Sequence, residues 1–190
     1  MFAIMNFYLP TKVNISGNEE PVRTDFRVIL EILTMLKDPE LSNSEKAYAL
    51  LYMFYENPEE ITDYEEAIKA CFEFIDGNGS EKKKSGPQLV DWEQDFDYIV
   101  APVNRVLGKE IRSEQDLHWW TFLSAYMEIG PDCLFSQIVN IRDKKARGKK
   151  LEKQESEWYR RNREIVDIKH KYTDAEDELI KQWKGGVSNG

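Results

Sequence analysis

The chain has 190 residues, of which 41% are hydrophobic and 12% aromatic, and its net charge at pH 7 is −9. This length allows one ordinary domain or two small ones with a real core, and the aromatic content excludes a chain that is disordered throughout. No stretch of 18 residues is free of charge, which excludes a membrane span, and the opening MFAIMNFYLP lacks the basic and long apolar regions expected of a secretory signal.

The first predicted element is a short β-hairpin. Polar and apolar residues alternate over residues 12–16, Gly17-Asn18 supplies turn residues that tolerate positive φ, and residues 19–22 return antiparallel. Because an isolated hairpin is only marginally stable, we expect it to pack against the rest of the fold.

Three helices are predicted next, each from apolar residues at helical spacing. The first has Thr24 as its expected N-cap and ends at Asp38-Pro39. The second and third begin with the expected capping boxes Ser42–Glu45 and Thr62–Glu65, in which a hydroxyl is followed three residues later by a glutamate. Gly77 closes the third helix as a C-terminal cap.

A segment without hydrophobic periodicity, GNGSEKKKSGPQ (77–88), interrupts the helices. Its Gly, Ser, Lys and Pro content predicts a flexible surface loop and the best domain boundary. The predicted organisation is a hairpin with three helices over 1–76, the loop, a helical part over 89–184 and a disordered tail over 185–190. The predicted fold class is mainly α: a multi-helix domain with a short N-terminal β-hairpin.

Beyond the loop the sequence predicts further helices and their limits. Pro102 should kink or break the helix that begins near Trp92, because proline removes a backbone donor and clashes with the preceding turn. Ser113 is the expected N-cap of an aromatic helix, and Gly130-Pro131 ends that helix and starts the next. Over 151–184, apolar residues seven apart predict either a short coiled coil or one amphipathic helix docked on the body.

The aromatic helix carries two adjacent tryptophans, Trp119 and Trp120, together with Phe122 and Leu123. Neighbouring side chains on a helix point about 100° apart, so we expect at most one of the two tryptophans to be fully buried. The other is the candidate aromatic contact to a partner, while Phe122 and Leu123 belong in or near the core.

No group of residues indicates catalysis, a cofactor or a metal site. The two histidines, His118 and His170, have no cysteine or carboxylate at a recognised ligand spacing, and we interpret His118 as a packed, hydrogen-bonded residue. The two cysteines are expected to be buried thiols in a reducing cytoplasm. A run of carboxylates is interpreted as a solvated first helical turn: Asp91, Glu93, Asp95 and Asp97. We therefore expect a protein that is not an enzyme.

One basic segment contrasts with an acidic body. Residues 1–141 hold 12 basic and 25 acidic side chains, whereas residues 142–163 hold 10 basic and 4 acidic ones. This separation favours a protein partner or head-to-tail association of copies. Basic residues interleaved with aromatic ones also suit single-stranded nucleic acid, although the acidic body would repel phosphate. A simple solvated helix face is the third interpretation.

Several blocks of the C-terminal half are distinctive in combination. They are DFDYI (95–99), LHWWTFLSAYMEIG (117–130), CLFSQIV (133–139), IRDKKARGKKLEKQE (141–155) and WYRRN (158–162), with TDFRV (24–28) and SEK (44–46) upstream. With these blocks the chain resembles a family of small proteins from long-tailed bacteriophages and prophages of Gram-positive hosts. The resemblance covers about residues 10–184, without the loop over 77–88.

Genes of that family lie between those for the major tail protein and the tape measure protein. The resemblance therefore implies a tail assembly chaperone that coats the long, helical tape measure protein and leaves it as tail tube subunits polymerise. It implies the tape measure protein and the major tail protein as partners, the host cytoplasm as location, and no catalytic residue or cofactor. Two alternatives are a structural component retained in the virion, at the tail tip or neck, and a nucleic-acid-binding regulator.

The candidate partner-binding residues combine the aromatic helix with the basic segment. They are Trp119, Trp120, Arg142, Lys144, Lys145, Arg147, Lys149, Lys150, Lys153 and Trp158. We expect several copies to lie along one tape measure chain, with the basic residues of one copy near the acidic body of the next. Exposed ion pairs contribute little each, so this association should be weak and sensitive to salt. Contact with a membrane is not expected.

Overall fold

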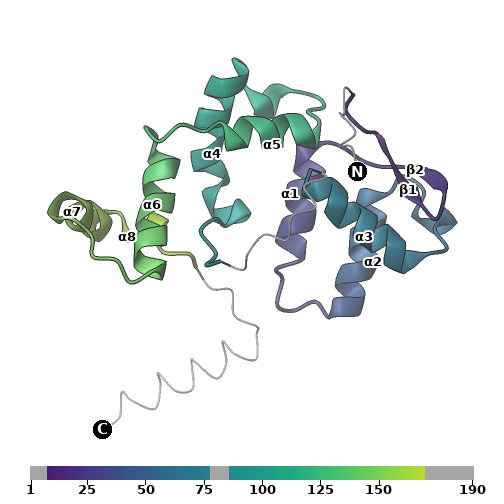
Figure 1. The fold of residues 1–190 in the computed structure, drawn as a ribbon, viewed down its shortest axis with the longest axis horizontal. Coiled ribbons are helices and arrows are strands. Elements are labelled where there is room, and N and C mark those ends of the chain that lie inside the picture. The colour runs from purple at the N-terminus through teal and green to yellow at the C-terminus, as the bar shows by residue number, and fades with distance from the viewer. Residues whose placement is uncertain (1–7, 78–85, 170–190) are drawn as a thin grey trace, which may run out of the picture.

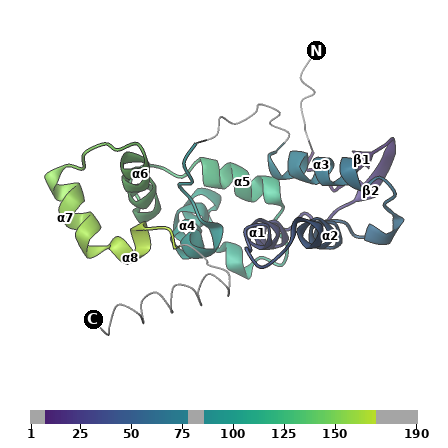
Figure 2. The same ribbon diagram turned by 90° about the horizontal axis from the view of Figure 1, so that it is seen from below.

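The computed structural model describes residues 8–77 and 86–169. Within these ranges the protein is mainly helical and begins with a two-stranded antiparallel hairpin, which confirms the predicted fold class. The elements are β1 (Lys12–Ile15), β2 (Asn18–Pro21), α1 (Phe26–Met35), α2 (Asn43–Phe54), η1 (Pro58–Glu60), α3 (Tyr64–Ile75), α4 (Trp92–Leu107), η2 (Ile111–Ser113), α5 (Trp119–Met127), α6 (Leu134–Ala146), α7 (Lys153–Arg161) and α8 (Arg163–Val166). Figures 1 and 2 show an elongated molecule, with the hairpin, α2 and α3 towards one end and α7 at the other.

The hairpin packs on α3 through its turn. Ser16 and Gly17 both have positive φ, at 50° and 93°, so the turn is centred one residue earlier than Gly17-Asn18, and Asn18 already belongs to β2. The backbone N–H of Ser16 donates to Glu66 at 3.1 Å, and the Ser16 hydroxyl lies 2.7 Å from the same carboxylate. These bonds hold the hairpin, which would be marginal alone, against the first turn of α3.

Two of the three predicted N-caps lie one residue later than the sequence pattern suggests. The capping box at Ser42 is present as predicted. The cap of α1, however, is Asp25 rather than Thr24, and the cap of α3 is Asp63 rather than Thr62. In both places a threonine and an aspartate that can each cap a helix are adjacent. The aspartate comes directly before the first helical turn, so its carboxylate reaches the free N–H groups of that turn.

Three further expectations about helix limits need correction. Pro102 does not break α4, which continues through it as one helix, and Ile99, Val100 and Val103 are buried around it. α5 is capped by His118, since Ser113 lies in the short η2 turn. α6 begins after a cap at Cys133 and not at Pro131, which leaves a three-residue bend before it.

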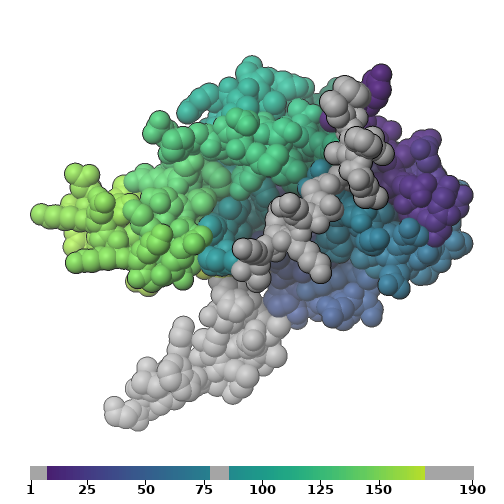
Figure 3. Space-filling model, in the orientation of Figure 1, coloured from purple at the N-terminus to yellow at the C-terminus, as the bar shows by residue number. Residues whose placement is uncertain are grey.

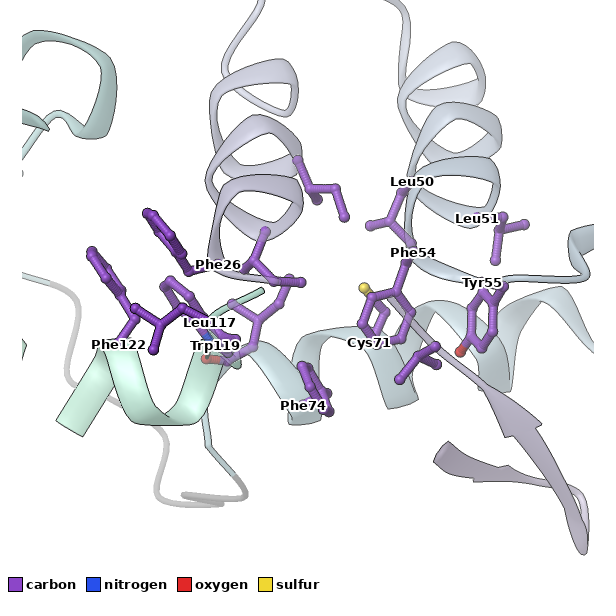
Figure 4. Close-up of a cluster of buried hydrophobic side chains, with 14 of the residues drawn as sticks. Phe26, Leu50, Leu51, Phe54, Tyr55, Cys71, Phe74, Leu117, Trp119 and Phe122 are labelled. Atoms are coloured by element: carbon purple, nitrogen blue, oxygen red, sulfur yellow. Dashed lines mark hydrogen bonds between the residues drawn. The ribbon is translucent and has the colours of Figure 1, made fainter. Parts of the chain in front are cut away.

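One large core joins residues from both sides of the segment 78–85. Phe26 of α1 stacks on Phe122 of α5, with ring centroids 4.8 Å apart, and Phe54 and Phe74 extend the cluster through α2 and α3 (Figure 4). Trp119 is 1% exposed and donates from its indole to the carbonyl of Ile75. The aromatic helix therefore completes a core that the first three helices begin.

The C-terminal part has a small core of its own. Ile138 and Ile141 of α6 and Val166 of α8 form a second buried cluster, and Trp158 and Tyr159 of α7 pack against it. A single helix from residue 151 onward is wrong, because α7 ends at Arg161 and α8 ends at Val166. Residues 170–184 of the predicted stripe, and the tail over 185–190, lie outside the described residues. No helix in the described ranges is long and apolar enough to cross a membrane.

Candidate partner-binding site

The two tryptophans of the aromatic helix face the interior to different degrees, which agrees with the expectation that only one is fully buried. Trp119 lies in the core, and Trp120 is half-buried and donates from its indole to the carbonyl of Phe74 at 2.8 Å. Both indole N–H groups are thus used within the chain. Trp158 is also half-buried, because it packs against the small C-terminal core.

Arg142 is buried and forms a salt bridge to Asp95, which is itself fully buried on α4. The guanidinium also donates to the carbonyls of Leu89, Ile165 and Val166. All these contacts lie inside the protein, so Arg142 offers no free surface to a partner. The interpretation of Asp95 as a solvated carboxylate is wrong. Asp95 lies one helical turn after the N-cap Asp91, and its side chain faces α6 instead of water.

Three other basic candidates are paired at the surface. Lys144 contacts Glu155, and this hydrogen bond lowers the pKa of the Glu155 carboxyl. Lys145 lies over the ring of Tyr159 and pairs with Asp167, and Arg147 pairs with Asp143 one turn before it on α6. These pairs connect α6 to α7 and to the end of α8. They also leave fewer cations for a phosphate backbone than the sequence alone suggests.

A second group of cations makes no side-chain ion pair or hydrogen bond within the described residues. Its members, which we call the cationic end, are Lys149, Lys150, Lys153 and Arg160. All four are exposed. Three of them line a shallow pocket of about 970 Å³, together with Leu151 and Tyr159. Figure 3 shows this part of the chain, green to yellow, projecting at one end of the molecule.

An exposed apolar groove lies between α5 and α6, and sequence reasoning did not find it. Met127 at the end of α5 is 67% exposed. A depression of about 350 Å³ beside it is lined by Met127, Phe135 and Val139, among others. The sequence indicates this groove only weakly, because Met127 lies next to the buried stripe of its helix. We call this surface the α5–α6 groove.

The described part of the chain holds no group of side chains arranged as a metal site. No three His, Cys, Asp or Glu side chains in it are placed to hold a metal ion. His118 is packed and hydrogen-bonded as predicted: its Nδ1 accepts from the N–H of Trp120 at 3.0 Å, so Nε2 carries the hydrogen and donates to the carbonyl of Pro10. His170 lies outside the described residues.

Comparison with known families identifies the group to which this arrangement belongs. The sequence model described as "Bacteriophage Gp15 protein" matches residues 5–168, which include the hairpin, both cores and the candidate surfaces. The chain belongs to this bacteriophage family. The match supports the phage origin that the sequence resemblance implied, and it assigns no partner. No curated protein and no solved structure matches the chain.

Proposed function

We propose that this protein is a phage tail assembly chaperone, which binds the tape measure protein without chemistry and releases it during tube assembly in the host cytoplasm. Membership of a bacteriophage family and the resemblance to tail-gene products support a role in phage assembly. The observation that carries the proposal is the α5–α6 groove, because a chaperone for long amphipathic helices needs an exposed apolar surface.

The groove suits repeated, reversible binding. Methionine is flexible and polarisable, so Met127 can adapt to different side chains along one helical partner. The groove is shallow, and Phe135 and Val139 carry its apolar surface along α6. A shallow contact of this kind binds many similar segments weakly, and growing tail tube subunits can displace it.

The α6–α7 contact borders the groove on one side. Asn140 lines the groove and donates to Glu155 of α7 at 3.4 Å, and Glu155 is held in turn by Lys144. The paired side chains therefore form a polar rim beside an apolar floor. An amphipathic helix would place its apolar stripe on the floor and its polar face towards this rim and the solvent.

Co-expression with the neighbouring tape measure protein, followed by pull-down, tests the proposal. The variant Met127→Ser/Ile129→Ser, at two side chains that line the groove, should capture at least about tenfold less tape measure protein, because two apolar contacts are lost at once. The matched control is Phe72→Ser/Val106→Ser, since each of these side chains is 43% exposed but lies away from the groove. Equal capture by both variants would exclude the groove, and no capture by the unchanged protein would exclude the chaperone function.

Mass spectrometry of purified particles separates the chaperone from a structural component. A chaperone should be absent or present only in traces, because it leaves as the tube closes around the tape measure protein. Recovery in fixed stoichiometry with the tail proteins would favour a component of the tail tip or neck instead.

A further inference from the structure

Three exposed tyrosines form a cluster where α2 approaches the start of α3. Tyr48 and Tyr52 lie one turn apart on α2, with ring centroids 4.3 Å apart, and they are 61% and 47% exposed. Tyr64, the first residue of α3, is 60% exposed. A hydrogen bond with Tyr48 raises the pKa of Tyr52, and the charges of Glu59 and Tyr64 raise it further. We call Tyr48, Tyr52 and Tyr64 the tyrosine face.

The chain around the tyrosine face is strongly acidic. Residues 56–66 contain six acidic side chains and no basic one. Asp63 and Glu66 are occupied by the helix cap and by Ser16, whereas Glu59, Glu60 and Glu65 are exposed. Three open aromatic rings beside unneutralised carboxylates make a surface for cations, because lysine and arginine bind to both groups.

The chain itself carries the complementary surface. The cationic end presents Lys150, Lys153 and Arg160 around Leu151 and Tyr159. Glu152, Glu157 and Arg163 line the same pocket, so four cations outnumber two carboxylates there, and the surface offers cations for rings and carboxylates and apolar atoms for packing. Figures 1 and 2 place α7 at one end of the long axis and α2, α3 and the hairpin towards the opposite end. One molecule therefore cannot join its own two surfaces.

We propose that the cationic end of one copy binds the tyrosine face of a second copy. Because the two surfaces differ and lie at opposite ends of an elongated molecule, each bound copy exposes a fresh surface for the next one. The result is an open, head-to-tail row and not a closed symmetric dimer. Cation–π contacts and exposed ion pairs make each junction weak and sensitive to salt.

This inference goes beyond the chaperone function and stands without it, since the row forms from the protein alone and uses neither Met127 nor Ile129. It also makes the expected weak self-association more specific. The acidic side of the contact is the tyrosine face and not the acidic body as a whole. The basic side is the cationic end, the part of the basic segment that has no partner within the described chain.

Sedimentation of the purified protein over a concentration series, at about 50 and 300 mM salt, provides the test, and the salt range spans strong to weak screening. The unchanged protein should form concentration-dependent oligomers at low salt that dissociate at high salt. Lys150→Glu/Lys153→Glu/Arg160→Glu and Tyr48→Ser/Tyr52→Ser/Tyr64→Ser should each remain monomeric. Arg105→Glu/Lys109→Glu, on exposed residues at the end of α4, is the charge control and should associate normally.

The decisive sample is an equimolar mixture of the two monomeric variants. Each retains one intact surface, so the mixture should form a one-to-one dimer that does not grow further. Circular dichroism confirms that each variant is folded. A mixture that stays monomeric, or a single variant that still associates, would overturn the inference. Loss of tape measure capture by the tyrosine variant without any change in self-association would also overturn it, because the face would then serve the tape measure protein.

Discussion

The guanidinium of Arg142 forms two hydrogen bonds to the carboxylate of Asp95, at 2.6 and 2.9 Å, and both side chains are buried. This bidentate pair joins α6 to α4 across 47 positions of sequence. The remaining donors of Arg142 reach carbonyls before α4 and around the end of α8. The pair thus helps to fix the small C-terminal core on the main body, and Gln94 of α4 adds hydrogen bonds with Ile165, Asp167 and Lys169.

Removing one partner of this pair should be far more damaging than removing both. Asp95→Ala should lower the free energy of unfolding by about 3–5 kcal/mol, because it leaves a buried guanidinium without its anion. In Asp95→Leu/Arg142→Met both charges are gone, so the loss should be smaller than that of Asp95→Ala alone. Urea denaturation at pH 7 measures the unchanged protein and both variants. A loss below about 1 kcal/mol for Asp95→Ala would show that the pair is not coupled to folding.

His118 should contribute to stability as a helix cap with two distinct bonds. His118→Ala removes the acceptor for the N–H of Trp120 and the bond to Pro10, and it should cost about 1–2 kcal/mol. His118→Asn retains a capping oxygen and should cost less. Thermal denaturation compares the two variants, and equal losses would mean that packing beside Phe74, and not the cap, determines the effect.

Glu110 should contribute stability that depends on pH. Hydrogen bonds from Arg112 lower the pKa of Glu110 from 4.5 to about 2. A carboxyl with a lowered pKa in the folded state stabilises the protein fully above its unfolded pKa, and this contribution is lost as pH falls towards the folded pKa. The difference in unfolding free energy between the unchanged protein and Glu110→Gln should therefore shrink between pH 4.5 and about 2. The exposed Glu31 on α1 provides the control, and a constant difference at Glu110 would contradict the prediction.

The two thiols should differ in reactivity. Cys71 is fully buried, and burial raises its pKa, whereas Cys133 is only half-buried at the cap of α6. An alkylating reagent at pH 8 should label Cys133 in the native protein. It should label Cys71 at least about a hundredfold more slowly, because Cys71 reacts only after opening of the core. The variant Cys133→Ser isolates the slow site. Equal labelling rates would show that the core around Cys71 opens easily.

The helices could be predicted because each buries one apolar stripe, but their exact starts could not. Thr24 precedes Asp25 and Thr62 precedes Asp63, and either member of each pair can cap a helix. Only the backbone path selects between them. Pro102 shows a different limit, since its penalty is local while the burial of its neighbours is set by segments distant in sequence.

Counting charges predicted a basic segment correctly but not which cations are free. Lys144 finds its partner 11 positions later and Lys145 finds one 22 positions later, at distances where no periodic pattern indicates a contact. Tyr64 shows the opposite case, a residue whose spacing suggests burial but which is exposed. It fits the apolar stripe of α3 by spacing, yet it is exposed because it begins this helix at the end of the molecule. A candidate surface depends on these distant pairings and exposures, so it requires the fold.

The position of Trp119 has a consequence for synthesis on the ribosome. The backbone N–H of Trp119 donates to the carbonyl of Thr24, and the N–H of Phe26 donates to the carbonyl of Leu117. The start of α1 is therefore hydrogen-bonded to residues that are synthesised more than 90 positions later. Until α5 emerges, the nascent helices expose the aromatic surface that this helix will cover. We therefore expect the core to close only after α5 has been synthesised, when more than half of the chain has left the ribosome.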